Sequence, residues 1–385
     1  MSNISGLNTG FWSKKLASLP DLIEIVGGVW VDQKIVRKSL DRISAALEND
    51  LKALRVQASF IFSTKTEVES LTGQNVELLR RWQMMGDSPS LTALSIFALE
   101  HFRVFAPEDL LRAVLIASVL GEVENDLSYH NNMHYRKVLL QLIRMISVHN
   151  DIYAGTARAF DEQQIGLLIT AACMHDLGHD GKGNTVKGVF EQGRLERRSF
   201  ELALPYFKAA GLNDPEALEA IKVMLLCTEV TPLGDPGNPM SQMKSAYRYH
   251  FLGHKTKTHT LNLDPDLARL QRDHDLVMMS LVLHEADIAT SAGLSYAVTK
   301  YETIIYMQEI KKEQACPQHV VDFLNQICQR QMLSDAAQRL YAANMARIYA
   351  LAEEDVKNGD QSFPPPQHSD FLLAHGAGDT AGTIN

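Results

Sequence analysis

Apolar residues recur every three or four positions along most of the chain, and alternating stretches long enough to build a sheet are scarce. This spacing gathers apolar side chains on one face of a helix. The pattern therefore predicts an all-α protein, a compact bundle of many helices. The expected helices cover residues 34–54, 91–99, 107–120, 132–148, 162–174, 195–209, 215–228, 265–290, 294–312 and 318–356.

Glycine and proline clusters interrupt the helical pattern at residues 178–188, 232–239 and 253–265. A weaker boundary near residue 88 separates an N-terminal helical extension, residues 1–87, from a larger domain expected at residues 88–357. The extension contains no plausible site. The tail, residues 358–385, contains three consecutive prolines and a glycine-rich end, so it has little to pack and is expected to be disordered.

The composition limits the classes of partner. With 385 residues, of which 45% are hydrophobic, the chain can bury a large core. A net charge of -9 argues against a nucleic acid or an anionic membrane surface as the main partner. The longest apolar runs, residues 113–120 and 165–174, are shorter than the roughly 20 residues that span a bilayer. We therefore expect no membrane span.

The compartment is inferred from two further features. Residues 1–10 lack the basic and apolar regions of a signal peptide. The four cysteines form no Cys-x-x-Cys pair and lie mostly in apolar helical patterns, which is typical of reduced core residues. These features predict a cytoplasmic protein.

Candidate chemistry lies in three segments that are far apart in the chain. They supply His134, the adjacent His175 and Asp176 after an apolar run, and Asp287 in a helix that is apolar on several sides. Burying such groups is costly unless something compensates them. Two imidazoles and two carboxylates form a mixed set that zinc, manganese and iron accept. Ordinary alternatives remain open: the histidines could be polar residues of the surface or core without a site role, and Asp287 could form an ion pair with a nearby lysine or arginine.

Taken together, three motifs resemble those of the class I 3′,5′-cyclic nucleotide phosphodiesterases, within the HD superfamily of metal-dependent phosphohydrolases. The motifs are Tyr-His-Asn-x-x-His from Tyr129, His-Asp-x-x-His-x-Gly-x-x-Asn from His175, and a later Ala-Asp that ends at Asp287. The resemblance covers roughly residues 129–341. Leu195-Glu196 and Leu226-Cys227-Thr228-Glu229 are weaker echoes of family motifs.

The resemblance implies a role for each matching position. His134, His175, Asp176 and Asp287 would hold a tightly bound zinc ion, and Asp176 would bridge to a second ion, magnesium or manganese, that is otherwise bound by waters. His179 and Glu196 would orient those waters, with Asn184 as a further support of the metal centre.

The resemblance also implies the mechanism and the fold, a phosphodiesterase-type bundle with the metal site in a deep pocket. In the implied mechanism, two ions about 4 Å apart would activate a water molecule that attacks phosphorus in line. His130 matches the general acid that protonates the departing 3′ oxygen, because an imidazole exchanges protons near neutral pH. With His179 it forms the implied catalytic pair. Tyr129, in the same motif, would contact the substrate, and the product would be a nucleoside 5′-monophosphate.

Fewer residues match the family at the positions that recognise the base. The family uses a glutamine and, three residues later, a phenylalanine; the counterparts here are Gln329 and Met332, although an ordinary amphipathic helix explains them equally well. The asparagine expected soon after Asp287 is absent, and Arg197-Arg198 replaces the paired histidines after Glu196. The choice between cyclic AMP and cyclic GMP therefore stays open.

Three functions remain in competition. The first is a cyclic nucleotide phosphodiesterase with a small-molecule substrate. The second is an HD-superfamily phosphohydrolase that acts on another nucleotide or phosphate ester. The third is a catalytically silent scaffold that regulates a partner through its N-terminal segment. A homodimer formed through the N-terminal helices is a further expectation.

Overall fold

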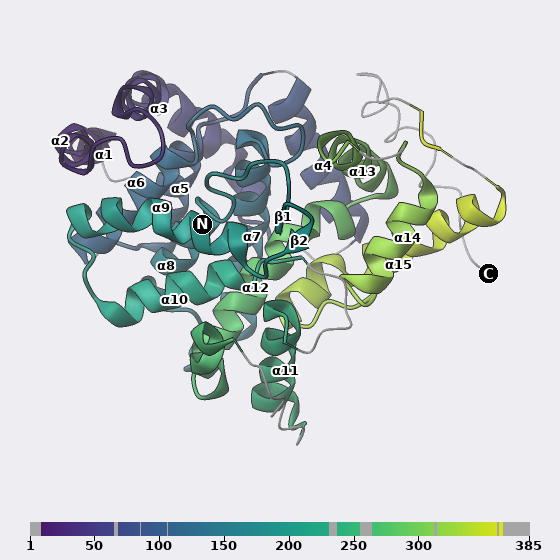
Figure 1. Cartoon of the computed structure of the whole chain (residues 1–385). Helices are drawn as coiled ribbons and strands as arrows, with labels where there is room; N and C mark the ends of the chain where they lie inside the picture. Colours follow the sequence, from purple (N-terminus) through teal and green to yellow (C-terminus); the bar gives the residue numbers. More distant parts are fainter. Residues whose placement is uncertain are drawn as a thin grey trace.

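A computed structural model describes residues 9–64, 68–84, 86–105, 107–230, 237–254, 264–311, 314–359 and 362–364. These residues form fifteen α-helices, one 3-10 helix and a two-stranded hairpin, so the all-α expectation is confirmed (Figure 1). The elements are α1 (Thr9–Leu16), α2 (Leu19–Val26), α3 (Gln33–Ile61), α4 (Val68–Met84), α5 (Leu91–Phe102), α6 (Glu108–Leu120), α7 (Asn132–Ile152), α8 (Glu162–Ala172), β1 (Thr185–Val186), β2 (Val189–Phe190), α9 (Arg194–Ala210), α10 (Pro215–Leu226), α11 (Pro239–Leu252), η1 (Pro265–Gln271), α12 (His274–Ala292), α13 (Tyr296–Glu309), α14 (Pro317–Gln326) and α15 (Asp335–Lys357).

Three helices that prove important below begin at side-chain caps. The Asn131 side chain accepts from the backbone N–H groups of Met133 and His134 at the start of α7. Asp161 forms a capping box at the start of α8, and Asp273 caps α12. Each cap satisfies backbone donors that the first helical turn leaves without partners. Local sequence therefore sets where these three helices begin.

Two expected helices are each divided in the structure, which corrects the sequence prediction. The range 265–290 contains the 3-10 helix η1 and then α12, because the Asp273 cap starts a new helix. The range 318–356 contains α14 and α15, separated by residues 327–334. Within that link Gln329 and Arg330 have positive φ angles of 55° and 53°, and the buried Glu285 carboxylate accepts backbone N–H groups of the link. Helices α1, α2, α4 and α11 were not expected.

A continuous apolar core joins the N-terminal helices to the rest of the described residues. Trp12 and Trp82, which are 0% and 1% exposed, belong to the same cluster as Leu139 of α7 and Leu281 of α12. Figure 1 shows α1, α2 and α3 on one side of the molecule, α14 and α15 on the other, and α7 and α12 between them. The proposed division at residue 88 and the homodimer contact stay predictions.

Only part of the expected tail is described. Phe363 is buried, with 4% of its surface exposed, and its N–H donates to the Ala315 carbonyl at 2.7 Å. Residues 365–385, on which most of the expected disorder falls, lie outside the described residues. Among the described helices, none combines the length and apolar character needed to cross a membrane.

Candidate metal centre

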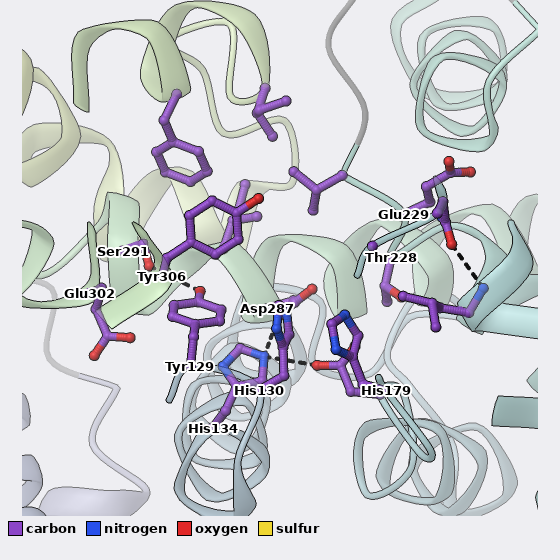
Figure 2. Close-up of a pocket in the computed structure, with 18 of the residues that line it drawn as sticks. Tyr129, His130, His134, His179, Thr228, Glu229, Asp287, Ser291, Glu302 and Tyr306 are labelled. Atoms are coloured by element: carbon purple, nitrogen blue, oxygen red, sulfur yellow. Dashed lines mark hydrogen bonds and ion pairs between the residues drawn. The ribbon is translucent and has the colours of Figure 1, made fainter. Parts of the chain in front are cut away.

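Three helices bring the four expected metal ligands together. α7 supplies His134 from its first turn, the turn after α8 supplies His175 and Asp176, and α12 supplies Asp287. Figure 2 shows His134 and Asp287 side by side. His134 Nε2 lies 3.3 Å from Asp176 Oδ2 and 3.2 Å from Asp287 Oδ1. His175 Nε2 lies 3.1 Å and 3.7 Å from the same two oxygens. The side-chain nitrogens and oxygens therefore converge on a single point.

The protonation of His175 shows what this point requires. Its Nδ1 lies 2.9 Å from the Ala172 carbonyl oxygen, which can only accept, so Nδ1 carries the hydrogen. In the neutral ring Nε2 then presents a lone pair to two carboxylate oxygens. Nε2 is buried and has no hydrogen-bond partner among the described residues. A lone pair that faces carboxylate oxygens is repelled unless Nε2 takes up a proton or a cation lies between these atoms.

The ionisation of the cluster points the same way. Burial by itself lowers the pKa of His175, but the Asp176 and Asp287 carboxylates outweigh burial and raise this pKa to about 9. The pKa of His134 is raised for the same reason, again against burial. The pKa of Asp176 is held well below its usual range although burial opposes this, because of His175 and other nearby histidines. The cluster therefore favours positive charge, which a divalent ion supplies in exchange for protons. These residues fit such an ion.

A second group lies beside the cluster and centres on His130. Its Nδ1 is 2.5 Å from Glu309 Oε1, and Glu309 Oε2 accepts the backbone N–H groups of Tyr129 and His130 at 2.7 Å and 3.0 Å. Burial raises the pKa of Glu309, but the His130 contacts outweigh it and lower this pKa to about 2. The Asn125 amide also donates to the His130 carbonyl at 2.6 Å. Glu309 thus holds both the ring and the backbone of His130.

Glu309 was not predicted as a site residue from the sequence. It is the last residue of α13, 179 positions from His130, and its neighbours in the sequence form an ordinary helical pattern. No local signal distinguishes it from an exposed acid. The fold alone brings it to the histidine.

His179 stacks on His130, with ring centroids 3.8 Å apart and planes 21° apart. Burial, with His130 as the next cause, lowers the pKa of His179 to about 4. The donor atoms of His130, His179 and Glu309 also lie within 4.8 Å of one another. However, the rings are nearly parallel, so their lone pairs cannot both point to an ion between them. The Nδ1 lone pair of His179 also already accepts the Gly181 N–H at 3.1 Å. This group suits proton transfer better than metal binding.

Comparison with known proteins gives structural matches only. No protein-family model matches the chain, and no curated protein does. The phosphodiesterase domain of a RhoPDE fusion protein from the choanoflagellate Salpingoeca rosetta matches with a TM-score of 0.50 and 17% identity, over 80% of this chain and 99% of that domain. The chain has the fold of a phosphodiesterase catalytic domain.

Two further solved structures are similar in outline. The phosphodiesterase domain of the Salpingoeca rosetta rhodopsin phosphodiesterase matches with a TM-score of 0.48 and 19% identity, over 80% of this chain and 96% of that one. Yeast caPDE2 matches with a TM-score of 0.46 and 12% identity, over 92% of this chain and 90% of that one.

The phosphodiesterase fold also brings Glu196 and Asn184 to the site. The Asn184 side-chain amide donates to Glu196 Oε2 at 3.0 Å and accepts the Leu195 N–H at 2.9 Å. Burial, reinforced by the nearby Glu229 carboxylate, raises the pKa of Glu196 to about 8. Glu229, from the weaker Leu-Cys-Thr-Glu echo, accepts the Gly193 N–H at 3.1 Å. Two carboxyl groups in close proximity therefore line the pocket beside the metal cluster.

All these groups border one pocket of the phosphodiesterase fold, with a volume of about 430 Å³. It extends from His134, Asp176 and Asp287 to α13 and α14. Tyr129 lines it, with its hydroxyl 3.3 Å from Ser291 Oγ (Figure 2). The expected substrate-binding residue Tyr129 is therefore at the site.

The two residues expected to bind the base are not brought to the pocket. Gln329 is exposed in the link between α14 and α15, where its side-chain oxygen accepts from Arg248 at 3.3 Å. Met332 is 1% exposed and packs in the core. The family resemblance had assigned both to the base, but in the structure they lie in the link between α14 and α15. Phe323 and Gln326 at the end of α14 line the pocket instead.

Proposed function

We propose that this chain is a metal-dependent phosphodiesterase that hydrolyses 3′,5′-cyclic nucleotides to nucleoside 5′-monophosphates. One observation carries the proposal: the Nε2 atoms of His134 and His175 lie 3.1–3.7 Å from the carboxylate oxygens of Asp176 and Asp287, and a histidine held by a carboxylate lies beside this cluster. The fold is consistent with this activity.

The cluster would hold the metal ions. His134, His175, Asp176 and Asp287 would bind zinc, and Asp176 would also contact a second ion, magnesium or manganese. When bound, the ions supply positive charge to the phosphate oxygens and make a water molecule more acidic. His175 is prepared for this role because its Nδ1–H bond to the Ala172 carbonyl orients the ring.

His130 would supply the proton that the departing 3′ oxygen needs. An alkoxide is a poor leaving group, so protonation as the bond breaks lowers the barrier. Glu309 assists in two ways: it stabilises the positive charge of protonated His130, and it fixes the ring through Nδ1, which leaves Nε2 for the substrate. His179, stacked against His130, restricts the rotation of that ring.

The test is hydrolysis of both cyclic purine nucleotides by the full chain loaded with zinc plus magnesium or manganese, with products separated by chromatography. We expect 5′-AMP or 5′-GMP, and we expect Asp176→Asn to lose bound metal and turnover together. Asp151→Asn, at an exposed position near the end of α7, is the matched control. A metal-loaded protein that converts neither nucleotide refutes the proposal. Turnover of another phosphate ester in a substrate panel would favour the broader HD phosphohydrolase function.

A further inference from the structure

The helix α14 presents one face to the pocket. Its pocket-lining residues are three, four and seven positions apart, which is the spacing of one helix face. These residues are His319, Asp322, Phe323 and Gln326. The opposite face buries Val320 and Leu324, both 0% exposed, in the core. The core contacts therefore hold a carboxylate, an imidazole, an amide and an aromatic ring against the pocket.

The Asp322 carboxylate has capacity to accept hydrogen bonds. Its Oδ1 accepts from the Gln318 side-chain amide at 2.8 Å. Among the described residues, no lysine, arginine or histidine lies within ion-pair distance of it, and no other donor to it is found. Each carboxylate oxygen can accept about two hydrogen bonds. Asp322 can therefore accept two donors from a ligand, one at each oxygen.

His319 offers the complementary group. Its Nδ1 accepts the Cys316 backbone N–H at 3.2 Å, so in the neutral ring the hydrogen lies on Nε2. His319 is thus a donor to the pocket. Gln326, whose amide has no partner among the described residues, can donate or accept. This helix face therefore fits a ligand edge with one acceptor, for the donor of His319, beside two adjacent donors, for the carboxylate of Asp322.

We propose that this face of α14 reads the base of the substrate, with Asp322 selecting guanine over adenine. The proposal rests on the function proposed above. Guanine presents N1–H and N2–H as adjacent donors, which match the two oxygens of one carboxylate, and its O6 accepts from His319 or Gln326. Adenine offers one donor and places the N1 lone pair where guanine has N1–H. The Phe323 ring supplies an apolar surface on which a base can stack.

The expected discrimination follows from one charge-assisted hydrogen bond. Guanine gains this bond to Asp322, whereas adenine leaves one carboxylate oxygen without a donor. The preference for guanine should therefore be about 10-fold or more. Asp322→Asn keeps the shape of the side chain but removes the charge and one acceptor. It should therefore remove most of the preference, mainly by weakening the binding of guanine nucleotides.

The experiment measures the dissociation constants of 5′-GMP and 5′-AMP by calorimetry, together with kcat/KM for the two cyclic nucleotides. The wild type, Asp322→Asn and the exposed control Asp151→Asn are compared. We expect a GMP preference of about 10-fold or more in the wild type and control, reduced to about 2-fold or less in Asp322→Asn. An unchanged ratio in Asp322→Asn overturns the proposal. If Gln329→Ala reduces the preference for GMP and Asp322→Asn does not, the proposal is also overturned, in favour of the residue expected from the sequence.

A substrate without a base separates this proposal from the one on which it rests. If bis(4-nitrophenyl) phosphate is hydrolysed, and cyclic AMP and cyclic GMP are hydrolysed equally well, the role of Asp322 is wrong while the phosphodiesterase activity stands. If no diester is hydrolysed but GMP binds more tightly than AMP through Asp322, the activity is wrong while base recognition by α14 stands. Calorimetry that detects neither nucleotide refutes the role of Asp322.

Discussion

Replacing Glu309 by glutamine tests whether His130 acts as an acid held by a carboxylate. The Glu309 side chain is 2% exposed and accepts from His130 Nδ1 and from two backbone N–H groups. Glutamine keeps the size but removes the charge, and its NH2 group must face at least one of these donors. When His130 holds the proton that it donates, the ring then lacks the carboxylate that faces its Nδ1.

The magnitude follows from that geometry. A hydrogen bond to a charged group contributes about 1.5–3 kcal/mol, so Glu309→Gln should reduce kcat/KM for a cyclic nucleotide by about 10- to 150-fold. The effect should depend on the leaving group. Bis(4-nitrophenyl) phosphate releases a phenolate that needs no proton, so its hydrolysis should fall by less than about 3-fold.

The assay compares the two substrates in wild type, Glu309→Gln and Glu354→Gln, an exposed Glu-to-Gln control on α15. Bound metal is measured in each protein and should stay the same. Equal losses on both substrates would refute the reasoning, because a general defect of the site does not distinguish leaving groups. A loss of metal in Glu309→Gln would place this residue in the metal centre instead.

Three further predictions test the cluster and the core beneath it. Asp287→Asn should lower bound metal by about 10-fold or more, since it removes an anionic ligand; unchanged metal content by elemental analysis would exclude the cluster as the site. Burial, with Lys244 as the next cause, lowers the pKa of His284 to about 3. As the pH falls, His284 is therefore protonated in the unfolded chain before it is protonated in the folded protein. The contribution of neutral His284 to the free energy of unfolding is complete above the pKa of His284 in the unfolded chain, and it decreases as the pH falls below that value. From pH 7 to pH 5, the free energy of unfolding measured in urea should fall by about 2 kcal/mol more in the wild type than in His284→Leu. Identical losses in the two proteins would contradict this. Lys137 Nζ lies 2.7 Å and 2.8 Å from the Glu302 oxygens, with both side chains 2% exposed. Lys137→Met should cost about 3–5 kcal/mol because it leaves a buried carboxylate unpaired, and Glu302→Gln added to it should recover much of that loss; a cost below about 1 kcal/mol would be inconsistent with a buried pair.

Much of the site could be predicted from the sequence because its signals are local. The spacing of apolar residues indicated most of the helices, and the adjacent His175 and Asp176 after an apolar run marked ionisable groups that burial would penalise. Side-chain caps place His134 at the start of α7. Each signal depends on residues within about one helical turn, and such signals survive without knowledge of the fold.

The tertiary structure decided which distant groups meet. Glu309 reaches His130 across 179 positions, and its surrounding sequence is that of any amphipathic helix. The break between α14 and α15 depends partly on Glu285, a buried acid on α12 that accepts backbone N–H groups near residue 333. Because helix periodicity carries no information about partners far along the chain, it extended that helix across residues 327–334. The assignment of Gln329 to the substrate came from the family resemblance.

The sequence by itself determined the helical class and the identity of the four candidate metal ligands. Only the fold decided that Asp322 and Phe323, rather than Gln329 and Met332, border the pocket. The physical reason is that a helix face is defined locally, while what lies opposite that face is set by the packing of the whole core.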